Sequence, residues 1–171
     1  MKKILLLIGS FLLIAGSSLQ AQRYAIIDTR LILDKLPDYK NAQKKLDQIS
    51  EQWQREIDAR QAALDKMYKD FDAEQVMLSD ELKKKREDEL FVRDREVREM
   101  HRRYFGPDGE LFKKRQEFVK PIQDRVYNAV QRLASQRGYD FILDKSEGIT
   151  VIFADPKLDK SEDVLRELGV K

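Results

Sequence analysis

The sequence predicts a mainly helical protein in which a long helical hairpin projects from a small α+β body. Charged residues make up 37% of the chain, and between residues 38 and 136 the apolar residues recur mostly at steps of three and four. This spacing leaves a narrow apolar stripe on each helix, which suits coiled-coil-like arms rather than a globular core. Short runs rich in β-branched and aromatic residues, at 24–28 and 139–144, flank the hairpin and predict strands.

The amino-terminal segment, residues 1–21, has the layout of a secretory signal peptide. Two lysines precede an apolar run at 4–15, and small and polar residues follow. The run is shorter than the ~20 residues of a membrane-spanning helix. We expect cleavage after Ala21, with Ser18 as the alternative point and an uncleaved anchor as the other interpretation. The mature chain is then expected outside the cytoplasm.

Composition excludes several classes of chemistry. The chain has 33 basic and 31 acidic residues, and removal of two signal-peptide lysines leaves it formally neutral, so nothing favours nucleic-acid binding. It contains no cysteine and a single histidine, His101, which excludes thiol chemistry and a histidine metal cluster. Gly106 and Gly109 are not followed by the Gly-Lys-Ser/Thr of a phosphate loop. The sequence indicates no catalytic, cofactor or metal site.

The first arm begins after a short helix. Thr29 is the expected N-cap of that helix, and Pro37 ends it. The helical pattern then weakens over 72–79, where Ser79 and the two acids after it predict the start of a returning helix. We therefore place the hairpin tip near 72–79. The stripe of the first arm comprises Tyr39, Ala42, Leu46, Ile49, Trp53, Ile57, Leu64, Met67 and Phe71.

The returning arm is interrupted. Gly106, Pro107 and Gly109 predict a break, which can be interpreted either as a hinge or as a simple end of a helix. Pro121 predicts the start or a kink of the last helical segment. The stripes of this arm comprise Leu82, Leu90, Val97, Met100 and Tyr104, then Phe118, Ile122, Val126, Ala129 and Leu133.

The end of the chain completes a three-stranded body. Gly138 is the expected C-cap of the arm, strands are predicted at 139–144 and 149–154, and Ser161 is the expected cap of a terminal helix that Gly169 stops.

The body, residues 22–37 and 137–171, flanks the arms at 38–136 and is too small to bury a large core alone. We therefore expect it to oligomerise. The apolar residues available for this are Ile26, Ile27, Phe141, Leu143, Val151 and Phe153.

This order of parts resembles the Skp/OmpH family of periplasmic chaperones for outer-membrane proteins, over essentially the whole mature chain. The resemblance implies a homotrimer whose arms enclose a client cavity like tentacles. It also implies an ATP-independent holdase, located in the periplasm, that binds unfolded outer-membrane proteins and prevents their aggregation. The family has basic arm tips, whereas residues 65–82 here hold two basic and six acidic residues. Membrane or lipopolysaccharide contact therefore has weak support.

Two surface features of the arms could carry binding. A basic run at 83–86 could touch anionic lipid, although the acids that follow it favour a solvated helix face. Apolar residues near the tip could contact clients, because methionine and aromatic side chains adapt to varied partners; otherwise they close the hairpin. These residues are Met67, Tyr68, Phe71, Val76, Met77 and Leu78.

Two other functions remain open at this point. A structural coiled-coil protein or adaptor of the cell envelope would share the signal peptide and the arms, but it would bind one fixed partner. An envelope hydrolase would need a nucleophile with a base or clustered ligands, and the sequence shows neither.

Overall fold

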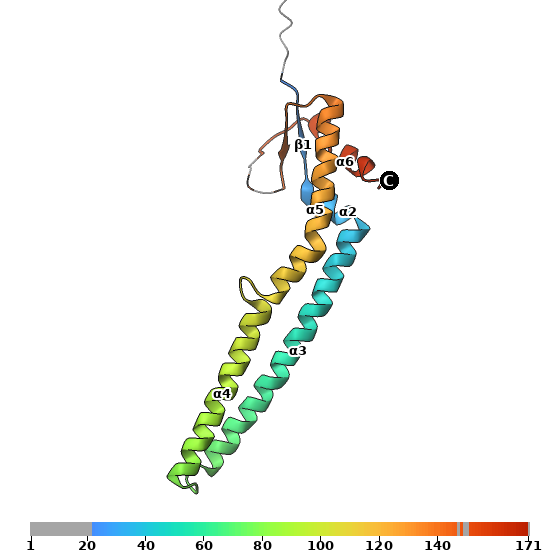
Figure 1. The fold of residues 1–171 in the computed structure, drawn as a ribbon. Coiled ribbons are helices and arrows are strands. Elements are labelled where there is room, and N and C mark those ends of the chain that lie inside the picture. Colours follow the sequence, from blue (N-terminus) through green and yellow to red (C-terminus); the bar gives the residue numbers. More distant parts are fainter. Residues whose placement is uncertain (1–21, 147, 149–150, 171) are drawn as a thin grey trace, which may run out of the picture.

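The structure, a computed structural model, describes residues 22–146, 148 and 151–170. Figure 1 shows a body at one end and two antiparallel helical arms that extend from it. The predicted signal peptide lies outside the described residues. The elements in chain order are β1 (Tyr24–Ile27), α2 (Thr29–Lys35), α3 (Pro37–Glu74), α4 (Asp80–Phe105), α5 (Glu110–Arg137), β2 (Phe141–Asp144), the 3-10 helix η1 (Pro156–Leu158) and α6 (Ser161–Glu167).

Local signals set the start of the first arm. The carboxylate of Asp28 accepts a hydrogen bond from the backbone N–H of Leu31 and so caps α2. The prediction that Thr29 is this cap was therefore wrong by one residue, because the hydroxyl of Thr29 instead donates to Asp144. Pro37 occupies the first turn of α3, where its missing N–H costs nothing.

The returning arm follows most of its predicted signals. The hydroxyl of Ser79 accepts from the backbone N–H of Leu82, which confirms it as the cap of α4. Gly138 ends α5 in the left-handed conformation with a φ of 63°. Pro121 lies inside α5, so it does not start a new helix. In α6, Ser161 is the first helical residue rather than the cap.

The body sheet has two strands among the described residues, not three. β1 and β2 pair in parallel, with Ala25 opposite Ile142. The predicted strand at 149–154 falls partly outside the described residues, and 151–154 are not a strand. The other edge of β1 is instead occupied by the chain near Asp159, because the N–H of Lys160 donates to the carbonyl of Ile26 at 2.8 Å.

The apolar side chains form two separate cores. The body core joins α2, α3, α5 and α6 and contains Ile27, Ile32, Leu36, Ala42, Leu46, Val119, Ile122, Val126, Ala129, Leu133, Val164 and Leu165. The arm core joins α3 and α4 and contains Ile57, Leu64, Leu90, Val97 and Met100. In α3, all of which the structure describes, no residue between Leu46 and Ile57 is fully buried. The arm stripe is therefore interrupted at this level.

A polar network ties β2 to α2 in the body. The carboxylate of Asp144 accepts hydrogen bonds from the N–H of Thr29 at 3.1 Å, from the Thr29 hydroxyl and from the N–H of Ser146 at 3.0 Å. Partial burial opposes ionisation of Asp144, but these hydrogen bonds outweigh it and lower its pKa below the ordinary 3.8. The ionised carboxylate therefore stabilises the fold.

The Asp144 network predicts an acid-sensitive body. Because the pKa of Asp144 is lower in the folded state, its contribution is fully present above pH 3.8 and is lost as pH falls through the folded pKa. We expect Asp144→Asn to lower the free energy of unfolding by roughly 1–2 kcal/mol at pH 7 and to have a smaller effect in acid. Chemical unfolding between pH 3 and 7 measures this difference. The control is Asp47→Asn on the exposed face of α3, and a difference that does not change with pH contradicts the prediction.

Candidate binding surfaces

The arm tip exposes apolar side chains. α3 and α4 reverse direction through residues 75–79, and in this connection Val76 is 87% and Met77 80% exposed. Leu78 is half-buried. These three residues are among those predicted for client contact, and two of them offer nearly all of their apolar surface to a partner.

The other predicted tip residues divide between two roles. Met67 and Phe71 are partly buried and pack against the arm core, so they act at least in part as the clasp of the hairpin. Tyr68 is 41% exposed. The apolar tip is therefore both a hairpin clasp and an exposed patch.

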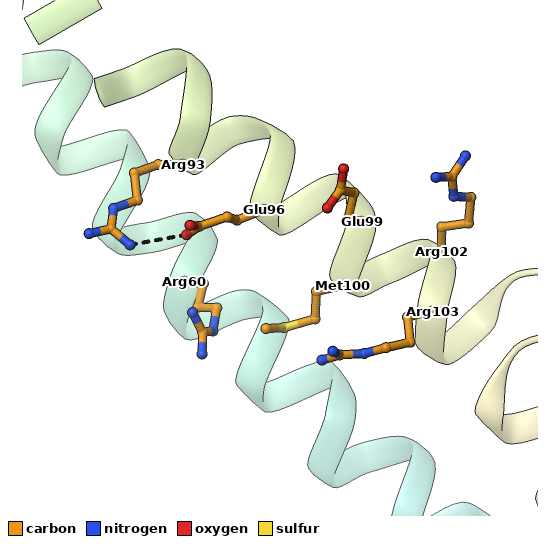
Figure 2. Close-up of a pocket in the computed structure, with 7 residues that line it drawn as sticks. All are labelled: Arg60, Arg93, Glu96, Glu99, Met100, Arg102 and Arg103. Carbon is orange, nitrogen blue, oxygen red and sulfur yellow. Dashed lines mark hydrogen bonds and ion pairs between the residues drawn. The ribbon is translucent and has the colours of Figure 1, made fainter. Parts of the chain in front are cut away.

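A groove of about 650 Å³ lies further along the arm, between α3 and α4. Figure 2 shows the side chain of Met100 between those of Arg60 and Arg103. Arg93 is joined to Glu96 by an ion pair of 3.0 Å. The lining residues are Arg60, Arg93, Glu96, Glu99, Met100, Arg102 and Arg103. We call this feature the arginine groove.

The arginine groove continues into a smaller hollow of about 260 Å³, whose lining includes Leu64, Met67 and Val97. The two hollows share Arg60, Arg93 and Glu96. Sequence analysis missed this feature, because its arginines come from two antiparallel helices whose register the sequence does not specify. The apolar stripes did identify Leu64, Val97 and Met100 as seam residues.

The basic run at 83–86 lies at the start of α4. Arg86 forms an ion pair of 3.5 Å with Glu89, and both side chains remain about half exposed. Lipopolysaccharide contact at this run stays a prediction.

The body carries apolar surface of its own. Tyr24 stacks on Phe141 with ring centroids 5.6 Å apart, and both side chains are 43% exposed. Phe153 is 84% exposed, whereas Ile26 and Ile27 are already buried within one chain. Of the six residues predicted for oligomerisation, Leu143 and Val151 are half-buried. Among these six residues, the exposed apolar area therefore belongs mainly to Phe141 and Phe153, and Ile152, which was not among them, is 94% exposed.

The break between α4 and α5 is a tight turn. The N–H of Gly109 donates to the carbonyl of Gly106 at 2.9 Å, with Pro107 between them. Neither glycine has a positive φ, so glycine is not required there by the backbone conformation. It is required because a side chain would not fit. A Cβ on Gly106 would lie 2.4 Å from the carbonyl oxygen of Arg102, and one on Gly109 would lie 2.8 Å from that of Tyr104. The backbone of the turn leaves no room for a side chain at either position.

Aromatic packing secures the arm next to this turn. Trp53 of α3 stacks on Tyr104 with ring centroids 4.6 Å apart and an interplanar angle of 4°. Phe105 packs edge-on against Trp53, and the Tyr104 hydroxyl donates to Glu56 at 3.1 Å. These contacts join α3 to the end of α4 in the stretch of α3 that has no fully buried residue.

No group of three or more metal-ligating side chains gathers among the described residues. Within the same ranges, no helix combines the length and apolar character needed to cross a membrane.

Comparison with known proteins places this chain in a family. The model of the outer membrane protein (OmpH-like) family matches residues 23–168. The chain belongs to the OmpH-like family. It is also 29% identical over 158 residues to the chaperone protein Skp of Yersinia enterocolitica, which covers 91% of this chain and 92% of that protein.

A solved structure shares the fold of this OmpH-like chain. It is the crystal structure of a Caulobacter crescentus CB15 protein described as an OmpH-like outer membrane chaperone, with a TM-score of 0.68 at 16% identity. The match covers 86% of this chain and 84% of that one. The OmpH-like proteins are chaperones rather than enzymes, which confirms the prediction that the chain has no catalytic role.

The close packing at the turn of this OmpH-like chain predicts a stability effect. We expect Gly109→Ala to lower the free energy of unfolding by roughly 1–3 kcal/mol, because the new Cβ must displace backbone atoms. Thermal unfolding followed by circular dichroism measures the effect. Asp108→Ala is the matched control, since Asp108 is an exposed residue of the same turn. Equal unfolding midpoints for the two variants would show that the turn has room to relax.

Proposed function

We propose that the protein is an ATP-independent periplasmic holdase that binds unfolded outer-membrane protein precursors between the arms of a homotrimer. The observation that carries this proposal is the pair of long arms, which extend far from the body (Figure 1). These arms expose apolar and charged side chains. Membership of the OmpH-like family and the relation to a chaperone protein support it.

The surface of the arms fits the chemistry of such clients. Precursors of membrane β-barrels carry segments of alternating apolar and polar residues and, while unfolded, have unpaired strand edges. Exposed Val76 and Met77 and the arginine groove offer many weak and separate contacts. Several weak contacts that act together hold a chain reversibly. Binding the unfolded chain prevents aggregation without folding it.

Assembly through the body is the second part of the proposal. Phe141 and Phe153 expose apolar area that a monomer leaves in water. A mostly apolar hollow of about 370 Å³, whose lining includes Val126, Tyr127 and Ile142, is a second apolar feature of the body. A second and third copy of the body would cover these surfaces and set the arms around a shared cavity.

The turn at 106–109 is the proposed hinge of each arm. It lies at the boundary between the two cores, because Phe105 packs against the arm core and Leu111 against the body core. Bending there, together with α3 between Leu46 and Ile57, where no residue is fully buried, would move the arm core relative to the body core. Distances between spin labels at Gln75 of the three copies test this: a broad distribution that changes with client supports a hinge, and a narrow unchanged one excludes it.

Location in the periplasm depends on the predicted signal peptide. Residues 1–21 carry its charge and hydropathy pattern. Sequencing the amino terminus of protein from the envelope fraction tests this, with a start near Gln22 expected and an intact Met1 in the membrane pellet as the contrary result.

Removing the outer arms is expected to abolish holding activity but not assembly. Every residue of the body core lies outside 51–109, so replacing this segment with a short glycine-serine linker preserves that core. Light scattering by an unfolded outer-membrane protein measures aggregation, and sedimentation measures assembly. A truncated assembly that protects clients as well as the intact protein contradicts the proposal, and it would favour an adaptor whose body binds a partner.

Phe141→Asp is expected to dissociate the assembly. The substitution places a charge where the proposed interface excludes water, which weakens association by more than about a hundredfold. Phe112→Asp is the matched control, because Phe112 is a similarly exposed phenylalanine, 46% against 43%, on α5 outside the body sheet. Sedimentation at micromolar concentration distinguishes them. A wild-type protein that sediments as a folded monomer, or equal behaviour of the two variants, overturns the assembly proposal.

A further inference from the structure

The arginine groove carries a net positive charge, and one of its arginines, Arg103, also lies over the ring of Tyr104. It is lined by four arginines and two glutamates. Glu96 pairs with Arg93 inside the groove, and Glu99 pairs at 3.7 Å with Arg95, which does not line it. Across the described residues, no ion pair joins Arg60, Arg102 or Arg103 to a carboxylate. The groove is therefore electrostatically complementary to an anionic partner.

The floor of the groove is apolar, and it is formed by residues of the arm core that are 2–8% exposed. Met100 is only 8% exposed and lies between two arginines (Figure 2). Leu64 and Val97 continue the floor into the smaller hollow, where Met67 is partly buried. Thioether side chains adjust to partners of different shape. A ligand that combines small apolar groups with separated negative charges fits this surface.

We propose that the arginine groove is a docking site for extended segments of an unfolded client in which carboxylates alternate with apolar side chains. In an extended segment, successive side chains point to opposite sides, so the apolar side chains can face the groove while the carboxylates lie on the outer side. The long side chains of Arg60 and Arg103 on the rim can then reach around the segment to these carboxylates. This inference rests on the proposed holdase function and names a contact site within it.

The shape and charge pattern favour a peptide over an anionic lipid. Glu96 and Glu99 place negative charge on the same rim as the arginines, which disfavours a headgroup with densely spaced phosphates. The smaller hollow, at about 260 Å³, has room for side chains rather than for several acyl chains. A rim that carries both positive and negative side chains, with arginine in excess, suits a peptide that carries scattered acidic residues.

The test measures binding of a fluorescent peptide to the full mature protein by anisotropy. The probe alternates valine with threonine and glutamate, and two matched peptides carry glutamine or lysine in place of glutamate. Arg60→Gln/Arg103→Gln is expected to weaken binding of the glutamate peptide about three- to tenfold, because each exposed ion pair contributes modestly. Added salt is expected to reduce the difference between this variant and wild type.

Two further variants distinguish peptide binding at the groove from a general effect of the protein's positive charge. Lys40→Gln/Lys44→Gln removes the same charge from exposed positions of α3 outside the groove and is expected to leave peptide binding unchanged. Arg60→Lys/Arg103→Lys keeps the charge and is expected to restore most of the binding. Circular dichroism and sedimentation show whether each variant retains its fold and assembly.

The outcomes separate this inference from the holdase proposal. If wild type suppresses client aggregation but binds the glutamate, glutamine and lysine peptides equally, or if both double glutamine variants lose equal affinity, the groove site is wrong and the holdase stands. If wild type fails to suppress aggregation, the holdase itself is wrong. Vesicles of phosphatidylglycerol and phosphatidylcholine are the second probe, and arginine-dependent binding of vesicles without binding of peptide would assign the groove to lipid and overturn the inference.

Discussion

The rest of the structure depends on the narrow apolar seam between α3 and its two antiparallel partners. The arm helices bury few residues, four of 38 in α3, three of 26 in α4 and five of 28 in α5, and the remaining faces are largely charged and solvated. Such a seam can hold two helices together, but it cannot attract a third layer. The arms are therefore elongated, and the exposed surface available for contacts with other molecules is large for a chain of 171 residues.

The body pairs two strands that the helical hairpin separates in the chain. β1 and β2 are parallel, and parallel neighbours need a crossover connection rather than a tight hairpin. Here the whole helical hairpin is that crossover. The pairing of β1 with β2 and the packing of α5 in the body core therefore hold the two ends of the hairpin together. Hydrogen bonds from Thr29 and Ser146 to Asp144 fasten this closure at the end of β2. The seam of the arms and the closure of the body thus depend on different sets of contacts.

Much of this architecture could be predicted from sequence because it depends on local signals. The periodicity of apolar residues, the Ser79 cap and the glycine and proline pattern at 106–109 each act within a few residues, and each is present in the structure. The strand predicted at 149–154 shows the limit. Val151–Phe153 has the composition of a strand, but the neighbouring position on β1 is occupied by the chain near Asp159. Composition indicates that a segment tends to form a strand, but it does not indicate which of several segments will pair with a given strand edge.

The candidate sites also divide into those that local sequence signals reveal and those that depend on packing between distant segments. The apolar tip could be found in the sequence, although the sequence left open whether its residues contact clients or close the hairpin; in the structure Val76 and Met77 are exposed. The arginine groove was not, because it requires the register between α3 and α4, which is set by the packing of Leu64, Leu90 and Val97 along the whole seam. Residues such as Arg60 and Arg103 then come together although 42 positions separate them in the chain.

Hydrogen–deuterium exchange of the mature protein, alone and with an unfolded outer-membrane protein, tests most directly the claim that the arms hold clients while the body holds the assembly. The arm core is small, so α3 beyond residue 50 and α4 are expected to exchange faster than β1, β2 and α5 in the free protein. Client is expected to slow exchange in the two arm segments and to leave the body unchanged. Protection confined to the body, with the arms unaffected, would contradict the account.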